Sequence, residues 1–567
     1  MDGRSSRLSH VTLVQRRSPA GVPRGVPLAA GWVVAAVIPI AFLGVFFAWP
    51  VITLIGRGFV DENGFTLAGF AEAFGAARTL RIIGQTLALA VTGTLASVAL
   101  GVPGAYVLYR CRFPGRTWLR ALVSVPFVLP TVVVGVAFKT LFNGPLAFLG
   151  IGESFGAIVL ALVFFNYSVI VRTVGAMWAR LDPRVVEAAR ALGATPARAL
   201  WTVTLPALAP AIASGAALVF LFCASAFGIV MIMGGVTWGT LETEIYYQTA
   251  QLLNLPVAAA LSIVQLTVVS ASLGLANATR TRRERALRLR TDGVAAPALR
   301  WSDWPAVVPT LAVVVGVIGL PLAALVTRSL ATPEGWGLHN YQLLGTVGSA
   351  GVSVWAAAAT SLATATQAAL LAVTLGLMVS FVLSRRPRTA LGQRAQQVLD
   401  SLFMLPLGVS AVTVGFGFLV ALNRPPLDLR SSTILIPIAQ AVVALPLVVR
   451  TLLPVLRALD PRQLEAAATL GAGPWRVAAT IEGPYALRGL GLALGFAFAT
   501  SLGEFGATSF LARPDTPTLP VLIFHLIGRP GADNQGMALA ACVMLALVTG
   551  TVMAAAEALG HGEARGW

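Results

Sequence analysis

Twelve long apolar runs dominate the chain, and short polar segments separate each run from the next. The runs centre near residues 44, 95, 130, 165, 220, 266, 316, 365, 410, 443, 497 and 547. A hydrocarbon core about 30 Å thick is crossed by roughly 20 residues of helix, and a helix leaves no backbone group unpaired in lipid. The pattern therefore predicts an all-α polytopic membrane protein with about twelve transmembrane helices.

The chain contains an internal repeat. Residues 171–206 align without a gap with residues 449–484, and TVVVGVAF at 131–138 matches AVTVGFGF at 411–418. Because six runs, an even number, separate the two copies, the repeats are expected to be parallel, with their axis along the membrane normal. We predict a first repeat over 31–277, a basic linker over 278–304 and a second repeat over 305–557. Tails 1–30 and 558–567 flank them.

Charge supports a membrane location and gives an orientation. Only 11% of the residues are charged, against about 25% in soluble domains. The net charge of +17 comes mainly from arginines in the N-terminal tail and in every even-numbered gap, as expected of cytoplasmic loops. Both termini are thus predicted to be cytoplasmic, and a nucleic-acid partner is not expected.

The repeated segment has its own local chemistry. Asp182 before Pro183 is a helix N-cap followed by proline at the first helical position. Gly193 is expected to end this short helix, and Thr195-Pro196 to start a second one. The other copy repeats the pattern from Asp460-Pro461 to Gly471. The alternative is an ordinary loop kept after gene duplication, but this segment matches more closely than most of the spans do.

These segments carry a family resemblance. EAARALGA at 187–194 and EAAATLGA at 465–472 resemble the EAA loop of bacterial ABC-importer permeases. The resemblance implies a type I importer permease fold in the bacterial inner membrane, and EAA loops at about 181–206 and 459–484. It also implies a cytoplasmic ABC ATPase partner, expected to be a homodimer, and an external substrate-binding protein or lipoprotein. The residues implied in ATPase coupling are Glu187, Ala188, Ala189, Gly193, Arg198, Glu465, Ala466, Ala467, Gly471 and Arg476.

The fusion of both halves in one chain is similar to thiamine and ferric-iron permeases. Three segments carry this closer resemblance, at residues 240–261, 405–418 and 501–514. It implies import of thiamine or ferric iron.

No catalytic site is predicted. A P-loop needs a lysine after glycine, whereas the one lysine, Lys139, follows Phe138. ATP and Mg are therefore expected on the partner ATPase, with no cofactor on this chain. Cys111, Cys223 and Cys542 lack metal-ligand spacing, so no metal site is predicted.

Ionisable residues inside a membrane are candidates for function. On this ground the substrate pathway is predicted to include Glu242, Glu244, Tyr246, Glu504, Asn166 and Tyr167. Carboxylates would attract a cationic cargo, and aromatic faces suit an organic cation. The alternative is that these carboxylates pair with arginines such as Arg172 or Arg513, or cap helix ends.

A gradient-driven secondary transporter is the main alternative function, because twelve spans in two parallel halves also describe that class. Its loop between spans 2 and 3 carries an acidic residue, and YRCRFPGRTW at 109–118 has none. Such a carrier also has no need of two matched docking segments. The permease of an ATP-driven importer is therefore favoured.

Overall fold

The computed structural model describes residues 30–61, 64–283, 297–332, 335–347, 351–385, 389–423, 428–429 and 432–562. The predicted tail 1–30, except Ala30, and much of the predicted linker lie outside these ranges, as do the last five residues. Within the described ranges, nine helices are long and apolar enough to cross a membrane. Three bent helix pairs raise the number of spans to twelve if each pair is one span. This agrees with the predicted all-α membrane fold.

The first half of the chain contains thirteen α-helices among the described residues. They are α1 (Ala30–Leu43), α2 (Trp49–Phe59), α3 (Ala68–Gly75), α4 (Ala77–Ala105), α5 (Arg116–Val128), α6 (Thr131–Asn143), α7 (Phe155–Trp178), α8 (Pro183–Ala191), α9 (Pro196–Ala199), α10 (Leu205–Ala224), α11 (Gly228–Met233), α12 (Leu241–Tyr246) and α13 (Leu255–Arg283).

The second half repeats this order among its described residues. Its helices are α14 (Trp304–Ala312), α15 (Leu320–Ser329), α16 (His339–Gln342), α17 (Val354–Ser384), α18 (Ala390–Met404), α19 (Ala411–Ala421), α20 (Leu435–Arg457), α21 (Pro461–Thr469), α22 (Pro474–Val477), α23 (Gly483–Leu502), α24 (Thr508–Leu511), α25 (Leu519–Ile527) and α26 (Ala532–Gly562).

Some of the short non-α elements occur at matching places in both halves. A two-residue hairpin follows the first span of each half: β1 (Val60–Asp61) with β2 (Gly64–Phe65), and β3 (Ala331–Thr332) with β4 (Gly335–Trp336). π-helical turns lie at Gly44–Ala48, Tyr106–Arg110, Leu200–Thr204, Tyr247–Gln251, Val313–Gly319 and Ala478–Glu482, and 3-10 turns at Ala147–Leu149, Trp301–Asp303, Leu343–Gly345 and Leu405–Gly408.

The apolar runs centred near 130 and 410 are broken helices. α5 and α6 meet at 105°, and the helical stretch Ala390–Gly408 meets α19 at 95°. At the first break Leu129 and Pro130 are extended, and proline cannot supply the amide that would continue the helix. At the second, extended Ser410 caps α19 by accepting a hydrogen bond from Thr413 N at 3.2 Å. Apolar composition predicted the spans but not these bends.

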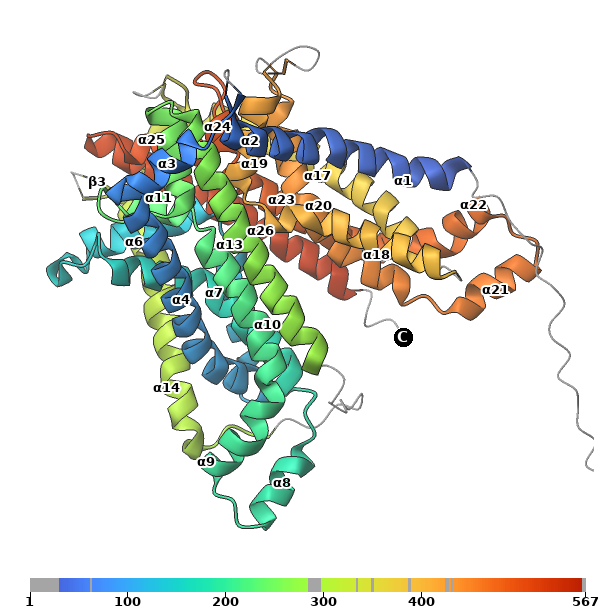
Figure 1. Cartoon of the computed structure of the whole chain (residues 1–567). Coiled ribbons are helices and arrows are strands. Elements are labelled where there is room, and N and C mark those ends of the chain that lie inside the picture. Colours follow the sequence, from blue (N-terminus) through green and yellow to red (C-terminus); the bar gives the residue numbers. More distant parts are fainter. Residues whose placement is uncertain are drawn as a thin grey trace, which may run out of the picture.

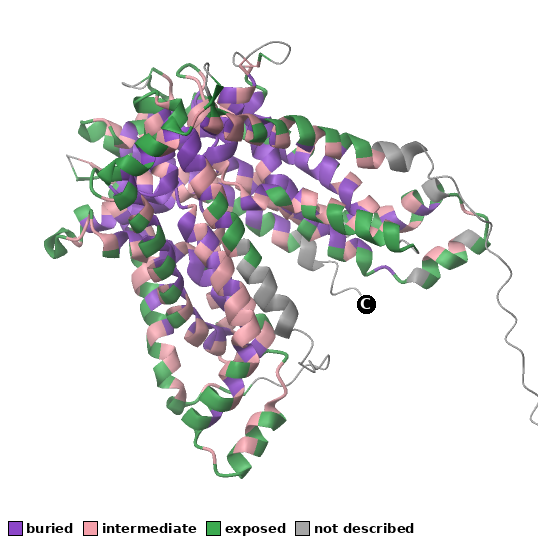
Figure 2. Cartoon of the chain, in the orientation of Figure 1, coloured by how far each residue is buried: buried purple, intermediate pink, exposed green. Residues whose placement is uncertain are grey.

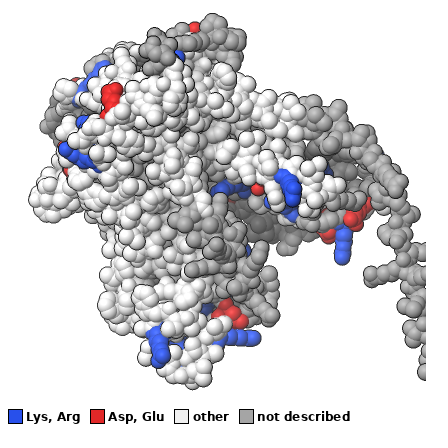
Figure 3. Space-filling view, viewed as in Figure 1, with Lys and Arg blue, Asp and Glu red and all other residues white. Residues whose placement is uncertain are grey.

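The molecule has two arms that meet at one end and diverge toward the other (Figure 1). Helices α8 and α9 lie at the tip of one arm, and α21 and α22 at the tip of the other. Buried residues run along the arms and gather where the arms meet (Figure 2). The space-filling view shows an open wedge between the arms and broad uncharged surface along them (Figure 3), as suits contact with lipid. We call the end where the arms meet the closed end.

The first span of each half packs on the other half. Helix α1 contacts α17 and α2 contacts α19, whereas α14 contacts α4 and α15 contacts α6. The two sequence repeats are therefore interlocked, and neither arm consists of one repeat alone.

The end of the linker is anchored on the first half. Arg112 N donates to Pro297 O at 2.8 Å, and Leu299 N donates to Arg112 O at 3.1 Å. The Tyr106 hydroxyl donates to Asp303 at 3.0 Å. These bonds place the start of α14 beside the end of α4, which explains how span 7 comes to lie on the first half.

An ion pair joins the C-terminal end of α17 to the segment that follows α22. Arg385 lies 2.7 Å from the carboxylate of Glu482, which is buried. We expect Arg385→Ala to lower the stability of the protein by about 1–3 kcal/mol, because a buried charge loses a charged hydrogen-bond partner. The measurement is the midpoint of thermal unfolding in detergent. Arg385→Ala combined with Glu482→Gln should recover part of the loss, since no unpaired charge remains; an unchanged midpoint in Arg385→Ala would contradict the role of the pair.

Candidate functional site: two EAA segments and the junction between the halves

The first EAA segment, residues 181–206, has the local structure expected from its sequence. The Asp182 carboxylate accepts a hydrogen bond from Arg184 N at 3.0 Å and caps α8, and Thr195 accepts one from Arg198 N at 3.3 Å and caps α9. Gly193 has φ +87°. Its amide and that of Ala194 donate to the carbonyls of Arg190 and Ala189 at 3.0 and 3.1 Å. This is the Schellman termination that a glycine after a helix favours.

The second EAA segment, residues 459–484, forms the same structure. Asp460 accepts a hydrogen bond from Arg462 N at 2.9 Å, and Gly471 has φ +77°. Thr480 donates to Arg476 O at 2.6 Å, as Thr202 does to Arg198 O at 2.7 Å. The two arms therefore end in equivalent pairs of short helices.

Both EAA segments present exposed side chains at their tips. The exposed members of the predicted coupling set are Glu187, Ala188, Gly193, Arg198, Glu465, Ala466, Gly471 and Arg476, with Ala189 and Ala467 half-buried. Each EAA segment also contains a leucine at the equivalent position. These are Leu192 and Leu470, which are 90% and 87% exposed. Large apolar side chains this exposed at matched positions suggest contact with a partner. Sequence reasoning missed them, although both stand directly before the repeated glycine.

The two glycines give a test of the local fold. We expect Gly193→Ala and Gly471→Ala each to cost about 1–2 kcal/mol locally, because alanine at positive φ is strained. No atom outside the local backbone lies within 4 Å of a Cβ added at either position, so the strain arises from φ alone. The measurement is the rate of limited proteolysis, which should be faster at the EAA segments of both variants. The control is Gly150→Asn, which alters a left-handed turn elsewhere (φ +63°). Equal proteolysis rates in the glycine variants and the wild-type chain would contradict it.

Aromatic side chains from both halves meet at the closed end. Phe227 and Phe505 hold equivalent positions in the two repeats. Phe227 directly precedes α11, and Phe505 lies shortly before α24. Their rings stack with centroids 5.1 Å apart and an angle of 23°. Tyr246, a predicted pathway residue, packs between Phe227 at 5.6 Å and Phe510 at 5.3 Å. The match of Phe227-Gly228 with Phe505-Gly506 was visible in the sequence, but nothing there showed that the two rings touch.

Glu242 lies at the same junction. Its side chain is fully buried and accepts hydrogen bonds from Gln265 Nε2 at 3.0 Å and from Ser410 Oγ at 2.6 Å. Among the described residues no basic side chain lies within salt-bridge distance of it. Gln265 and Ser410 were not predicted from the sequence, because neither stands near Glu242 in the chain.

The other two predicted carboxylates have partners within their own half of the chain. Glu504 accepts hydrogen bonds from Ala507 N at 2.7 Å and Thr508 N at 3.0 Å, so it caps the start of α24. Glu244 pairs with Arg78 at 3.1 Å, and Arg78 also lies over the ring of Tyr247. The arginine partners considered from the sequence, Arg172 and Arg513, are not among these contacts.

Asn166 and Tyr167 are packed between helices. Asn166 donates to Leu162 O at 2.9 Å and to Cys223 Sγ at 3.4 Å, which joins α7 to α10. Tyr167 is fully buried against Gly104 of α4. These contacts indicate a role in helix packing.

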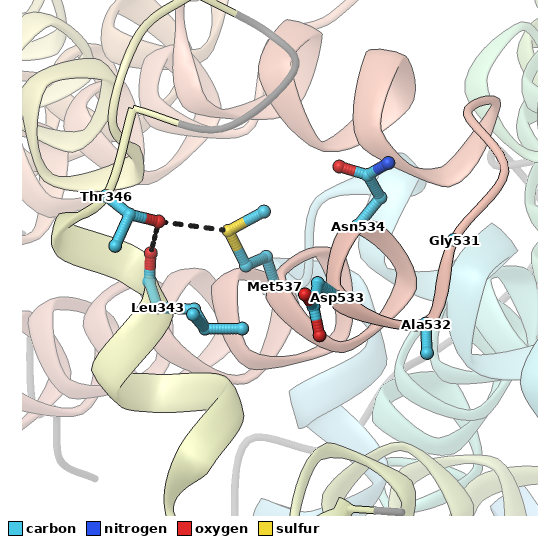
Figure 4. A pocket seen from close by; sticks show the side chains of 7 residues that line it. All are labelled: Leu343, Thr346, Gly531, Ala532, Asp533, Asn534 and Met537. Carbon is cyan, nitrogen blue, oxygen red and sulfur yellow. Dashed lines mark hydrogen bonds between the residues drawn. The ribbon is translucent and has the colours of Figure 1, made fainter.

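A separate cavity of about 350 Å³ lies where α26 begins (Figure 4). Its lining residues are Leu343, Thr346, Gly531, Ala532, Asp533, Asn534 and Met537. It contains none of the predicted site residues, so the candidate pathway is the junction of the two halves.

Comparison with known protein families explains this duplicated architecture. The model of the binding-protein-dependent transport system inner membrane component matches residues 100–283 and again residues 372–562. The two matches together cover more than half of the chain. The chain belongs to this family. It is therefore an ABC-importer permease, a multi-pass membrane protein of a family of transport components, with two permease units fused in one polypeptide.

Individual relatives in this family differ in cargo. The permease is 27% identical over 540 residues to the thiamine transport system permease protein ThiP of Brucella suis, with 92% of this chain and 94% of the relative covered. It is 35% identical over 201 residues to the sulfate transport system permease protein CysT of Salmonella typhimurium, with 33% and 70% covered. A solved bacterial ABC transporter that imports alginate matches 45% of this chain and 98% of its own chain, with 18% identity and a TM-score of 0.39.

Proposed function

We propose that this chain forms the translocation pathway of an ABC importer for a small solute delivered by an external binding protein. A separate ATPase dimer would drive transport through the two EAA segments. The observation that carries the proposal is the matched pair of exposed EAA segments at the tips of the two arms. Two equivalent docking elements on one chain suit two identical ATPase subunits, one on each arm.

We propose thiamine as the cargo. The thiamine permease relatives align over nearly the full fused length, whereas the sulfate permease relatives align over a third of it. The junction supports a cation as well, because it combines Glu242 with aromatic rings, and aromatic faces attract organic cations. A sulfate pathway would be expected to present basic groups or backbone amides to the anion.

The two EAA segments are proposed to face the cytoplasm, which follows from the arginine-rich even-numbered gaps. The closed end would then face the external binding protein, and the structure would be closed to the outside and open toward the ATPase. Both termini would be cytoplasmic.

The test is uptake of labelled thiamine into proteoliposomes that contain this chain and its ATPase, with binding protein outside the membrane. We expect uptake that requires ATP and is lost when Glu187 and Glu465 are both replaced by arginine. Labelled sulfate and ferric iron serve as competing cargoes. Uptake of either in place of thiamine would contradict the cargo, and uptake that needs an ion gradient but ignores ATP would contradict the mechanism.

A further inference from the structure

A hydrogen bond at the closed end joins the two halves directly. Glu242 belongs to α12 of the first half, and Ser410 lies at the break before α19 of the second half. The Ser410 hydroxyl donates to the Glu242 carboxylate at 2.6 Å. Helices α12 and α19 also contact each other, so this bond lies within a packed contact between the halves.

The second half is built in the same way but lacks the carboxylate. In the first half Leu241 N, at the start of α12, donates to Thr86 of α4 at 2.9 Å. In the second half Leu519 N, at the start of α25, donates to Ser361 of α17 at 2.7 Å. The residue that follows is Glu242 in one half and Pro520 in the other. Since one half forms this helix start without an acid, the helix start itself does not require Glu242.

Burial makes Glu242 costly to keep. Its two described donors, Gln265 and Ser410, are neutral, and a buried carboxylate without a cation costs several kcal/mol even after relaxation. A buried acid that its helix start does not require suggests that a cation meets it at some stage of the cycle.

The environment of Glu242 indicates which cation fits. Tyr246 follows one helical turn later in α12 and packs against Phe227 and Phe510. One carboxylate beside several aromatic rings suits an organic cation, whose charge is spread and whose surface is largely apolar. A metal ion would instead favour several oxygen, nitrogen or sulfur ligands together.

We propose that Ser410 covers Glu242 in the present state, and that separation of the halves at the closed end uncovers the carboxylate to bind the positive charge of an organic cargo. Ser410 lies at the 95° break on the second half, so a movement that parts Phe227 from Phe505 also withdraws its hydroxyl. Return of Ser410 then displaces the cargo toward the open wedge. This inference rests on the proposed importer function.

Distance measurement tests the movement. Glu242→Cys with Ser410→Cys is made in a background in which Cys111, Cys223 and Cys542 are serine, and cross-linked with a short thiol-specific reagent. We expect efficient cross-linking without nucleotide and a severalfold loss when ATP and vanadate trap the complex with its binding protein. The matched control is Asn166→Cys in a background that keeps the native Cys223 and has serine at Cys111 and Cys542; this pair lies within one half and should cross-link equally in both states. Equal yields in both states for the Glu242–Ser410 pair would overturn the proposal.

Transport tests the charge. Glu242→Gln keeps the size of the side chain and removes the charge, and we expect a tenfold or greater fall in uptake of labelled thiamine. Glu242→Asp should keep part of it. Glu72→Gln, which alters another carboxylate that accepts a neutral donor (Asn254 Nδ2, 2.7 Å), is the control and should transport normally. Each variant is compared at equal amounts of ATPase co-purified with the chain.

The two proposals fail in different ways. Normal ATP-driven uptake in the wild-type chain and in Glu242→Gln would overturn the role of Glu242 and leave the importer function standing. Absence of ATP-driven uptake in the wild-type chain would contradict the importer function itself.

Discussion

Aspartate in place of both Leu192 and Leu470 will abolish ATP-driven uptake and release the ATPase from the chain. The two leucines are among the most exposed large apolar residues of the described chain, and they stand at equivalent positions at the two arm tips. An apolar side chain that fills a partner pocket contributes about 2 kcal/mol or more, which is more than tenfold in affinity for each site. Charged aspartate would also have to be desolvated in the pocket.

The measurement is co-purification of the ATPase with the tagged chain, followed by uptake in proteoliposomes. Leu391→Asp is the matched control, since Leu391 is 78% exposed and lies outside both EAA segments. The single variants Leu192→Asp and Leu470→Asp should each retain one intact docking element and bind more weakly than the wild-type chain. Full binding and uptake in the double variant would rule out these leucines as docking residues.

Alanine in place of both Phe227 and Phe505 will raise ATP hydrolysis in the absence of binding protein about tenfold or more. The two buried rings stack across the junction, and such stacking contributes about 0.5–1.5 kcal/mol beyond the apolar area buried. Their loss should favour the state in which the closed end opens and the EAA segments approach each other. A shift of about 1.4 kcal/mol in this equilibrium changes the ratio of the two states tenfold.

Phe138→Ala is the control for this second prediction. Phe138 is also buried and makes an aromatic contact, with Phe164 at 5.6 Å, but both rings belong to the first half. It should lower thermal stability by a similar amount without raising basal hydrolysis. If Phe138→Ala raised hydrolysis equally, general destabilisation would explain the effect and the stack would have no role in the closed state.

The asymmetry of the junction has a bearing on fused permeases. Repeats that arise by duplication begin identical. Here Glu242 of the first half contacts Ser410 of the second half, whereas Pro520 holds the position equivalent to Glu242 in the second half. Fusion keeps each half with a fixed partner, so each side of the pathway can change independently. A single acid can then be placed on one side only.

The sequence by itself determined the elements whose causes are local. Apolar runs of membrane length depend only on composition along the chain, and they gave the spans. Asp182-Pro183, Gly193 and their second copies specify caps and a terminator through contacts within a few residues, and the structure confirms them. The internal repeat gave the parallel two-half arrangement, because equal sequences fold alike.

Tertiary structure alone decided which distant residues meet. The first spans are exchanged between the halves, with α1 on α17 and α14 on α4. The hydrophobicity of the sequence does not reveal this exchange, since a lipid-facing and a helix-facing leucine are equally apolar. For the same reason the sequence did not foresee the contact of Phe227 with Phe505, or the packing of Tyr167 between helices. Glu242, Glu244 and Glu504 were all candidates by composition. Only the structure separated the cap formed by Glu504 from the ion pair of Glu244 and the buried acid Glu242. The partners of Glu244 and Glu242, Arg78 and Ser410, lie more than 160 residues away in the chain.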